Sequence, residues 1–244
     1  MADHVACSSR SRGPLTIPPL HLWGPPGVGK TRFASDLAKA LEAPIRRQSM
    51  ENAQTTSLLL GTERHWSNAA PGIVFEEIVL GDFANPVFLI DEIDKAPRGG
   101  QYDPVAPLHS LLEPLTATKV RDASLDMEFD ASLAIYIATS NDPHKVPSTL
   151  LSRFRQFEIR SPRGEDALQV ARVVVSTAIE QRAVPGFAVP DRALAHKLAH
   201  LTAREISQAV HDAVARAAGA GRSKLVESDF PAEVLGVDRR PLLH

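Results

Sequence analysis

The stretch that decides the fold is Gly24–Thr31, which reads GPPGVGKT and follows an apolar segment ending at Leu22–Trp23. It satisfies the pattern G-x-x-x-x-G-K-[ST], in which glycines let backbone N–H groups converge on phosphate oxygens. The N-terminus of a following helix adds partial positive charge where the anion lies. The loop therefore predicts a nucleotide-phosphate site between a strand and a helix. Its residues are Gly24, Pro25, Pro26, Gly27, Val28, Gly29, Lys30 and Thr31.

Two side chains of this loop have the chemistry of an ATP site. The Lys30 ammonium would neutralise the β- and γ-phosphates, and the Thr31 hydroxyl would be a ligand of Mg²⁺. The helix predicted over residues 30–42 has apolar residues four apart on one face: Phe33, Leu37 and Leu41. A chance glycine-rich turn is the alternative, and about one chain in a hundred of this length would contain the pattern. The flanking strand and helix favour the nucleotide site.

A second motif is the acidic end of an apolar strand. Val87–Asp94 reads VFLIDEID, so carboxylates follow a continuous apolar run at the sheet edge where the phosphate loop also lies. Asp91 could hold Mg²⁺ through water, and Glu92 could act as general base on the attacking water. The alternative for two adjacent carboxylates is a solvated loop start. Their pairing with the phosphate loop favours the catalytic interpretation.

Strands and helices alternate along the first two thirds of the chain, and helices alone follow. Short apolar runs predict strands at residues 87–90, 134–138 and 157–159, and a further strand is predicted over 45–49. A helix is predicted over 73–80, after a Pro-Gly pair. Helical patterns then cover residues 165–182, 191–201 and 203–218. The alternation predicts an α/β fold of the P-loop NTPase type, a parallel sheet sandwiched by helices, followed by a small all-α domain.

We therefore expect a polar N-terminal tail over residues 1–16, an α/β nucleotide-binding domain over 17–160 and a helical domain over 161–244. The formal net charge is −2 and basic residues are spread along the chain, so neither nucleic acid nor an anionic membrane is indicated. The single cysteine, Cys7, agrees with a reducing compartment. The first sixteen residues contain no apolar signal segment, and no apolar helix is long enough to span a bilayer. We expect a cytoplasmic protein.

Three motifs in order give the sequence a family resemblance. GPPGVGKT, FLIDEID and IATSND (Ile137–Asp142) together resemble the AAA+ ATPases. Three further stretches make the likeness strongest to the ATPase module of Lon-type proteases: GTERHWSNAAPG (Gly61–Gly72), YDPVAPLHSLLEP (Tyr102–Pro114) and VPSTLLSRF (Val146–Phe154). The likeness extends from about residue 18 to residue 218. It implies an AAA+ domain with a helical lid, ATP and Mg²⁺ as cofactors, and a homo-oligomeric ring.

The resemblance assigns roles to three more polar side chains. Asn141 would be the sensor-1 residue that orients the lytic water, and its alternative is the start of an Asn-Asp-Pro turn. Arg153 would be the arginine finger that reaches the γ-phosphate of a neighbouring subunit, with Arg155 as the competing residue. Arg204 resembles the sensor-2 arginine, which the lid contributes to its own subunit's site. For each arginine the alternative is an ordinary solvated side chain.

The helix that carries Arg204 has a recognisable start. Thr202-Ala-Arg-Glu205 is a capping box, with Thr202 as N-cap and Glu205 at N3. Arg204 would lie in the first turn. Three apolar residues would face the core of the helical domain: Ile206, Val210 and Val214. Where Ala203 stands, the family usually has a glycine or another small residue.

Trp66 lies in the polar segment His65–Asn68, five residues before the Pro71-Gly72 pair. Lon-like modules place an axial pore-loop aromatic there, which would grip an extended polypeptide threaded through a hexamer. Trp replaces the more usual Tyr or Phe. A lone Trp is more often a core or half-buried anchor. A bulky apolar residue in a polar loop nevertheless indicates contact with an external partner.

The sequence indicates neither a zinc site, nor a cysteine nucleophile, nor a peptidase site. His196 and His200 are four residues apart on one predicted helical face, but Lys197 stands where a zinc-protease helix needs glutamate. Cys7 has no basic or helical setting that would make it a nucleophile. No Ser–Lys peptidase segment follows the last predicted helix, so we expect no protease activity.

Two functions of different classes follow. The first is a motor ATPase that remodels or threads protein substrates in a ring, with Arg153 and Trp66 as its features. The second is an ATP-binding switch that organises a partner protein with little turnover; Glu92 and Asn141 argue against it. A nucleic-acid-dependent AAA+ such as a clamp loader would need a basic or aromatic surface that the sequence lacks. About sixteen polar residues precede the first strand, fewer than AAA+ modules use to hold adenine. Three alternatives follow: a partial adenine site with weak nucleotide affinity, a truncated chain start, or a partner that completes the site.

Overall fold

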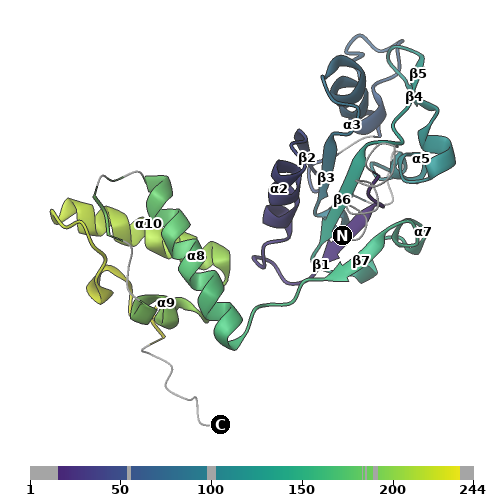
Figure 1. The fold of residues 1–244 in the computed structure, drawn as a ribbon. Coiled ribbons are helices and arrows are strands. Elements are labelled where there is room, and N and C mark those ends of the chain that lie inside the picture. The colour runs from purple at the N-terminus through teal and green to yellow at the C-terminus, as the bar shows by residue number, and fades with distance from the viewer. Residues whose placement is uncertain are drawn as a thin grey trace. The chain divides into compact units, whose positions relative to one another are not determined.

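The computed structural model describes residues 16–53, 56–97, 103–182, 184, 186–188 and 192–236. Cys7 and all but the last residue of the polar tail predicted over 1–16 lie outside this part of the chain. Contacts divide the protein into two units (Figure 1). The α/β unit comprises the chain up to Gly24 and Lys30–Ile159, and the helical unit comprises Pro25–Gly29 and the chain from Arg160 onward.

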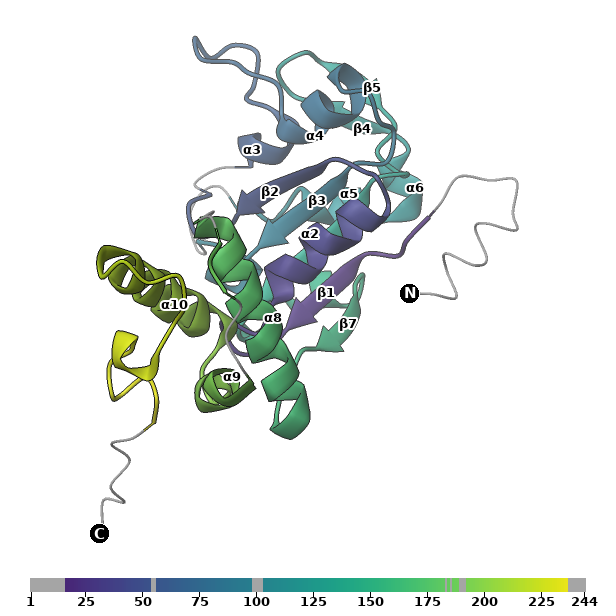
Figure 2. The same ribbon diagram turned by 60° about the vertical axis from the view of Figure 1, so that its left-hand side comes forward.

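The α/β unit is built on five parallel strands in the order β2-β3-β6-β1-β7. Their bounds are Leu20–Trp23 (β1), Ile45–Ser49 (β2), Val87–Asp91 (β3), Ile135–Ser140 (β6) and Arg155–Glu158 (β7). Helix α2 (Lys30–Ala40) follows β1 and lies along one face of the sheet (Figure 2). This arrangement confirms the parallel α/β fold that the alternation of strands and helices predicted.

Strands β3 and β6 lie inside the sheet, and both of their faces are covered. The side chains toward α2 belong to one core, which contains Val87, Leu89, Ile135 and Ile137. Those on the opposite face belong to a second core, which contains Phe88, Ile90, Tyr136 and Ala138. Alternate residues of a strand point to opposite faces, so a strand buried on both sides is apolar at each position. The unbroken run VFLI in β3 follows from its place in the sheet.

Helix α2 meets the sheet through small side chains. Ala34 and Ala38 are fully buried, whereas Phe33 is 43% exposed. Leu37 and Leu41 are partly buried against the same core. The predicted apolar face through Phe33 is therefore wrong. The helix turns its alanines inward because small side chains let its backbone pack closely on the strands.

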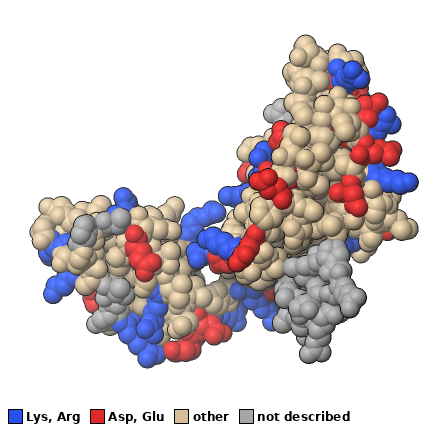
Figure 3. Space-filling view, turned by 45° about the horizontal axis from the view of Figure 1, so that its top comes forward, with Lys and Arg blue, Asp and Glu red and all other residues tan. Residues whose placement is uncertain are grey.

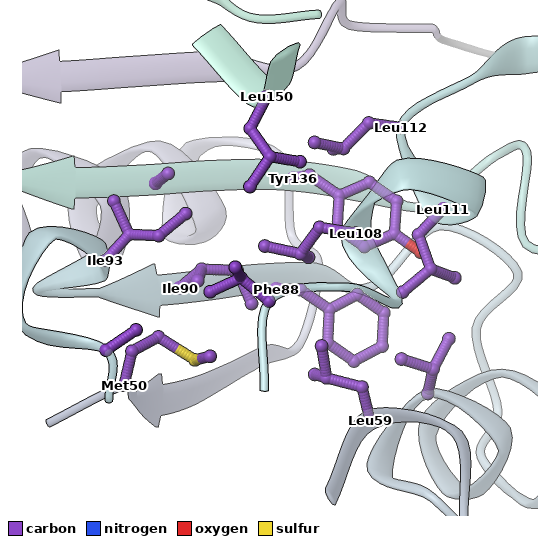
Figure 4. Packing of buried hydrophobic residues seen from close by; sticks show 14 of the residues in the cluster. Met50, Leu59, Phe88, Ile90, Ile93, Leu108, Leu111, Leu112, Tyr136 and Leu150 are labelled. Atoms are coloured by element: carbon purple, nitrogen blue, oxygen red, sulfur yellow. The ribbon is translucent and has the colours of Figure 1, made fainter. Parts of the chain in front are cut away.

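The second core lies under short helical segments on the other face of the sheet (Figure 4). These are α3 (Ser57–Leu60), α4 (Ile73–Phe75), α5 (Leu108–Leu111) and α7 (Ser148–Leu151). In the close-up, the rings of Phe88 and Tyr136 are stacked with centroids 5.5 Å apart. The helix predicted over residues 73–80 consists of α4 continued by a π-helical stretch, η1 (Glu76–Leu80).

A small antiparallel hairpin lies outside the main sheet. It follows α6 (Pro114–Ala117) and pairs β4 (Val120–Asp122) with β5 (Met127–Phe129). The sequence did not predict it, because three residues are too few for an alternating pattern to show. Two 3-10 turns, η2 (Ile93–Lys95) and η3 (Pro143–Lys145), come after β3 and β6.

The helical unit contains α8 (Gly164–Arg182), α9 (Arg192–Leu198), α10 (Ala203–Gly219) and the short η4 (Glu227–Asp229). The three residues predicted to face its core, Ile206, Val210 and Val214, are buried as expected. Helix α9 ends at Leu198, so His200 lies beyond it. The single helical face predicted for His196 and His200 is therefore wrong.

Helix α10 begins with the predicted capping box. The Thr202 Oγ1 accepts a hydrogen bond from the Glu205 N–H at 3.3 Å, and the Glu205 carboxylate accepts one from the Thr202 N–H at 2.7 Å. Two backbone donors that a helix start leaves unpaired are thereby satisfied. The bond from the Thr202 N–H, followed by that from its hydroxyl, lowers the pKa of Glu205. This stabilisation is present above the ordinary carboxyl pKa and is lost as acid protonates Glu205.

The surface is of mixed charge. On the face shown in Figure 3, Lys and Arg side chains lie among Asp and Glu side chains. The formal net charge of −2 agrees with that mixture. Within the described residues, the helices are too short or too polar to cross a membrane.

We expect Thr202→Ala to lower the free energy of unfolding by about 1 kcal/mol, because an N-cap hydroxyl and its reciprocal partner are lost. Ser207→Ala is the matched control, since it removes a hydroxyl from the same helix at a position where alanine favours helix. Urea unfolding followed by circular dichroism compares both variants with the wild type. Equal stability of all three would show that the capping box contributes nothing.

Candidate functional site

The carboxyl ends of β1, β3 and β6 meet at one edge of the sheet. Trp23 at the end of β1 lies opposite Ser140 at the end of β6, and the next N–H, of Gly24, donates to the Ser140 carbonyl at 3.3 Å. Asp91 ends β3 and Asn141 follows β6. Polar groups that end neighbouring parallel strands converge in space. Two predicted site residues are thus brought to the edge from which α2 begins.

Lys30 is the first residue of α2 and is 8% exposed. Its Nζ donates to the Gly24 carbonyl at 2.7 Å and to Asn141 Oδ1 at 3.0 Å. Burial lowers the pKa of Lys30, and the carboxylates of Asp94, Asp91 and Glu92 oppose that change. The ammonium group is therefore surrounded by oxygen atoms and negative charge.

The phosphate loop needs glycine for steric reasons at its first position. Gly24 has φ +151°, and a Cβ there would lie 2.1 Å from the Ile159 carbonyl oxygen. Gly27 and Gly29 have φ +79° and +98°, a region that disfavours other residues. The motif spacing is thus explained by backbone conformation as well as by access for a phosphate.

Asp91 is the central carboxylate of the site and is 2% exposed. The Thr31 hydroxyl donates to its Oδ1 at 3.2 Å, and the Thr139 hydroxyl donates to the same oxygen. Arg47 from β2 donates to Oδ2 through Nε at 2.8 Å and forms an ion pair at 2.6 Å. A buried carboxylate needs such partners, because an unpaired charge away from water is costly.

The residues present fit a magnesium ion with a nucleotide. Mg²⁺ prefers oxygen ligands, and the Thr31 hydroxyl and Asp91 carboxylate adjoin one another. Clusters of three or more His, Cys, Asp or Glu side chains that could hold a metal alone do not occur among the described residues. Phosphate and water oxygens would complete the coordination, as is usual for Mg²⁺ with nucleotides.

Glu92 leaves the strand in an unusual backbone conformation. Its φ of 57° and ψ of 47° are left-handed, and its N–H donates to Thr139 Oγ1 at 3.0 Å. For a residue with a side chain this conformation costs about 1 kcal/mol. The side chain is about one-third exposed and pairs with Lys95 at 3.0 Å. The turn therefore gives two adjacent carboxylates different surroundings, with Asp91 buried and Glu92 partly in solvent.

Asp94 holds the loop that carries Asn141. Its Oδ2 accepts hydrogen bonds from the N–H groups of Asn141 at 3.1 Å and Asp142 at 3.0 Å. Its Oδ1 is buried and has no hydrogen-bond partner within the described part of the chain. Asp94 belongs to the motif DEID, but the motif predicts no role for it. The interaction spans 47 residues of sequence, and no local pattern reveals it.

His21 is a fully buried polar residue in β1 behind this loop. Its Nε2 lies 2.8 Å from Ser140 Oγ, the residue just before Asn141. Burial lowers the pKa of His21 to about 4, against the smaller opposing effect of Asp94. The imidazole is therefore neutral at physiological pH, and it connects β1 to the end of β6.

The predicted arginines lie in different parts of the protein. Arg153 follows α7 and donates through Nη1 to the Thr149 carbonyl. Its Nε is buried without an acceptor among the described residues. Arg155 is exposed in β7, and Arg204 is exposed in the first turn of α10 in the helical unit.

Trp66 is 56% exposed in the α/β unit, and its ring lies 5.5 Å from that of His65. It borders a groove of about 560 Å³. The groove is lined by residues of three segments, among them Leu60, Glu63, Trp66, Asn68, Pro107 and Arg121. A large apolar ring that borders an open groove is placed to contact another molecule.

Comparison with known proteins identifies the family to which the chain belongs. The model of the family described as "ATPase family associated with various cellular activities (AAA)" matches residues 20–161. The fold is also similar to that of a point mutant of RuvB from Thermotoga maritima, with a TM-score of 0.60 at 16% identity over 91% of this chain and 62% of that chain. The chain belongs to the AAA family of ATPases.

Within that family, the chain is similar to curated relatives named Lon protease. It is 36% identical over 149 residues to the one from Campylobacter concisus and 30% identical over 190 residues to the one from Mycoplasmopsis agalactiae. These matches cover 61% and 77% of this chain but 18% and 19% of the relatives. The chain thus spans about a fifth of the relatives' length. The resemblance to the ATPase module of Lon proteases is confirmed.

We expect Arg47→Gln to strengthen the Mg²⁺ dependence of nucleotide binding, because Arg47 pairs with Asp91 and would compete with Mg²⁺ for it. A competing ion pair of about 1 kcal/mol corresponds to about fivefold in affinity. A fluorescent ATP analogue titrated with Mg²⁺ and with excess EDTA gives the ratio of the two dissociation constants.

Arg46→Gln is the control for that measurement. Arg46 is the neighbouring arginine of β2, but its partners are Glu76 and Glu77. Its removal should leave the ratio at the wild-type value. If Arg47→Gln gives the same ratio as Arg46→Gln, Arg47 does not compete with the metal ion.

Proposed function

We propose that this protein hydrolyses ATP with Mg²⁺ and uses the energy to remodel or thread polypeptides as a ring of identical subunits. The observation that carries the proposal is the cluster formed by Lys30, Asp91 and Asn141 at the carboxyl edge of the sheet. Membership of the AAA family supports nucleotide binding there. The similarity to proteins named Lon protease supports a polypeptide as the substrate.

Different residues would bind the phosphates, hold Mg²⁺ and orient the attacking water. Lys30 and the backbone of Gly24–Gly29 would bind the β- and γ-phosphates. Thr31 and Asp91 would hold Mg²⁺, which supplies positive charge to the phosphate oxygens when bound. Asn141 would orient the attacking water.

Glu92 would accept the proton that this water loses. Its side chain is about one-third exposed at the end of β3, so a water molecule can reach the carboxylate, and the 3.0 Å contact with Lys95 holds the side chain in place. The hydrogen bond to Glu92 is the largest cause of the raised pKa of Lys95.

The role proposed for Arg153 requires a neighbouring subunit. Its side chain is partly exposed and one Nη1 donor is bonded to the Thr149 carbonyl, so its remaining terminal N–H groups would be the donors for a phosphate of the neighbouring subunit. A site completed in this way is active only in the ring, for which we propose a hexamer. Arg204 would act on the nucleotide of its own subunit.

Glu92→Gln should bind ATP with unchanged affinity but lose at least about a hundredfold in turnover, because the general base is removed. Arg153→Ala should lose turnover as well, since its neighbour's site lacks the finger. An equal mixture should regain activity. In it, a subunit with intact Glu92 can lie beside one with intact Arg153. Malachite-green phosphate release measures all three.

Two controls accompany the mixture of the Glu92→Gln and Arg153→Ala variants. Arg155→Ala should keep its turnover, because Arg155 is the arginine not assigned as the finger. Size-exclusion chromatography checks that every variant assembles. Assembled but inactive mixtures would show that Arg153 does not act in trans. Wild-type turnover near zero at every protein concentration would favour the ATP-binding switch instead.

Trp66→Ala should abolish the stimulation of ATP turnover by casein, an unfolded polypeptide, because the indole would no longer grip the chain. Trp66→Tyr should retain most of the stimulation, since it keeps an aromatic ring of similar reach. Turnover is measured against casein concentration for both variants. Full stimulation of the alanine variant would show that Trp66 is only a surface anchor.

A further inference from the structure

Asp122, at the end of β4, is a fully buried carboxylate outside the nucleotide site. Its Oδ2 accepts a hydrogen bond from the Gly72 N–H at 2.8 Å. Its Oδ1 accepts three more, from the N–H of Ser124 at 2.9 Å, the hydroxyl of Ser124 at 2.8 Å and the N–H of Leu125 at 3.1 Å. All four donors are neutral, and the adjacent Arg121 pairs instead with Asp126. Such a carboxylate is tolerated in the interior only because these donors replace its water.

The Asp122 carboxylate lies at the base of the loop Gly61–Gly72. Gly61 has φ +85°, and a Cβ there would lie 2.7 Å from Asp122 Oδ2. A Cβ on Gly72 would lie 2.3 Å from the Leu59 carbonyl oxygen. Both ends of the loop are therefore glycine because the backbone passes so close to the carboxylate and to itself.

Backbone hydrogen bonds close the same junction. The Ala123 N–H donates to the Leu60 carbonyl at 2.8 Å, which ties the hairpin to the start of the loop. The Thr62 N–H donates to the Ala70 carbonyl at 3.0 Å, which brings the two sides of the loop together. With the bond from Gly72 to Asp122, the loop is held at both ends to one turn of the β4–β5 hairpin.

This junction supports the exposed Trp66. Within the loop, the Trp66 N–H donates to the Glu63 carbonyl at 3.1 Å, and the Ala69 N–H donates to the Trp66 carbonyl at 3.0 Å. The groove beside the indole has walls from both structures, since Trp66 and Asn68 come from the loop and Arg121 and Ala123 come from the hairpin. The relative position of loop and hairpin therefore determines the shape of the groove.

We propose that Asp122 is a positioning residue that fixes the Trp66 loop to the β4–β5 hairpin, so that the two form one contact surface for an extended polypeptide. The proposal rests on the polypeptide role proposed above for Trp66. The indole and the apolar walls at Leu60 and Pro107 suit apolar side chains of that polypeptide. Glu63 and Arg121 at the same groove supply polar partners for its backbone.

Asp122→Asn tests the positioning role with little change in volume. An amide has one oxygen, so it can keep the three bonds of Oδ1 or the single bond of Oδ2, but not both. Keeping the three bonds turns the NH₂ group toward the Gly72 N–H, where donor meets donor. The substitution should therefore detach the loop while the turn of the hairpin persists.

Hydrogen–deuterium exchange of peptides covering residues 60–73 measures that detachment. Loss of a hydrogen bond to a buried charge should speed exchange of the Gly72 amide at least about tenfold. Asp126→Asn is the matched control, because it changes an exposed carboxylate of the same hairpin to an amide and should exchange as the wild type does. Wild-type exchange in Asp122→Asn would overturn the proposal. If this variant does not fold, Ser124→Ala removes one donor and should give a smaller increase in the same peptides, and no increase would again overturn it.

Casein-stimulated turnover separates this proposal from the role of Trp66. Asp122→Asn should raise the casein concentration for half-maximal stimulation about tenfold, with the KM for ATP unchanged, whereas a general loss of structure would alter both. If Trp66→Ala keeps its stimulation while Asp122→Asn speeds exchange, the polypeptide role fails and the anchoring of the loop stands. If Trp66→Ala loses stimulation while Asp122→Asn keeps wild-type exchange and casein dependence, the anchoring proposal is wrong.

Discussion

The interaction on which the α/β unit depends most is the set of bonds to the buried carboxylate of Asp91. Thr31 reaches it from α2, Arg47 from β2 and Thr139 from β6, so one side chain joins three elements to the end of β3. Removing a charge from water at this point is costly, and only these partners offset the cost. The same geometry that satisfies the carboxylate places the Thr31 hydroxyl beside it, and both groups offer the oxygen ligands that Mg²⁺ prefers.

Two other carboxylates hold loops of the α/β unit by their backbone. Asp94 binds the backbone of Asn141 and Asp142, and Asp122 binds the backbone of Gly72. Such bonds fix a loop by its main chain and leave its side chains free for a ligand. Apolar packing could not do this, because a loop whose side chains are buried has none left to present. The two hydrophobic cores of the α/β unit therefore end at the edge of the sheet. Beyond that edge, hydrogen bonds from backbone N–H groups to carboxylates stabilise the loops.

Local features of this protein could be predicted from the sequence, and long-range ones could not. The phosphate loop, the strand VFLI and the capping box each depend on residues a few positions apart. Arg47 and Asp91 are 44 residues apart in sequence, and they meet only because β2 pairs with β3. The buried face of α2 was predicted wrongly at Phe33, because the prediction relied on hydrophobicity. Close packing on the strands favours the small side chains of Ala34 and Ala38 at that face. The roles of Asp94 and Asp122 were missed for the same reason as that of Arg47.

Three charged groups that would meet a nucleotide with Mg²⁺ have partners within the α/β unit. Lys30 is bonded to Gly24 and Asn141, Asp91 is paired with Arg47, and Glu92 is paired with Lys95. Binding of ATP with Mg²⁺ at the proposed site would therefore exchange existing contacts for new ones, and the binding affinity would measure only the difference. The same exchange would free the Asn141 side chain from Lys30 if a phosphate took its place. The backbone of Asn141 and Asp142 is held by Asp94, so the Asn141 side chain could change its partner while its backbone stays in place.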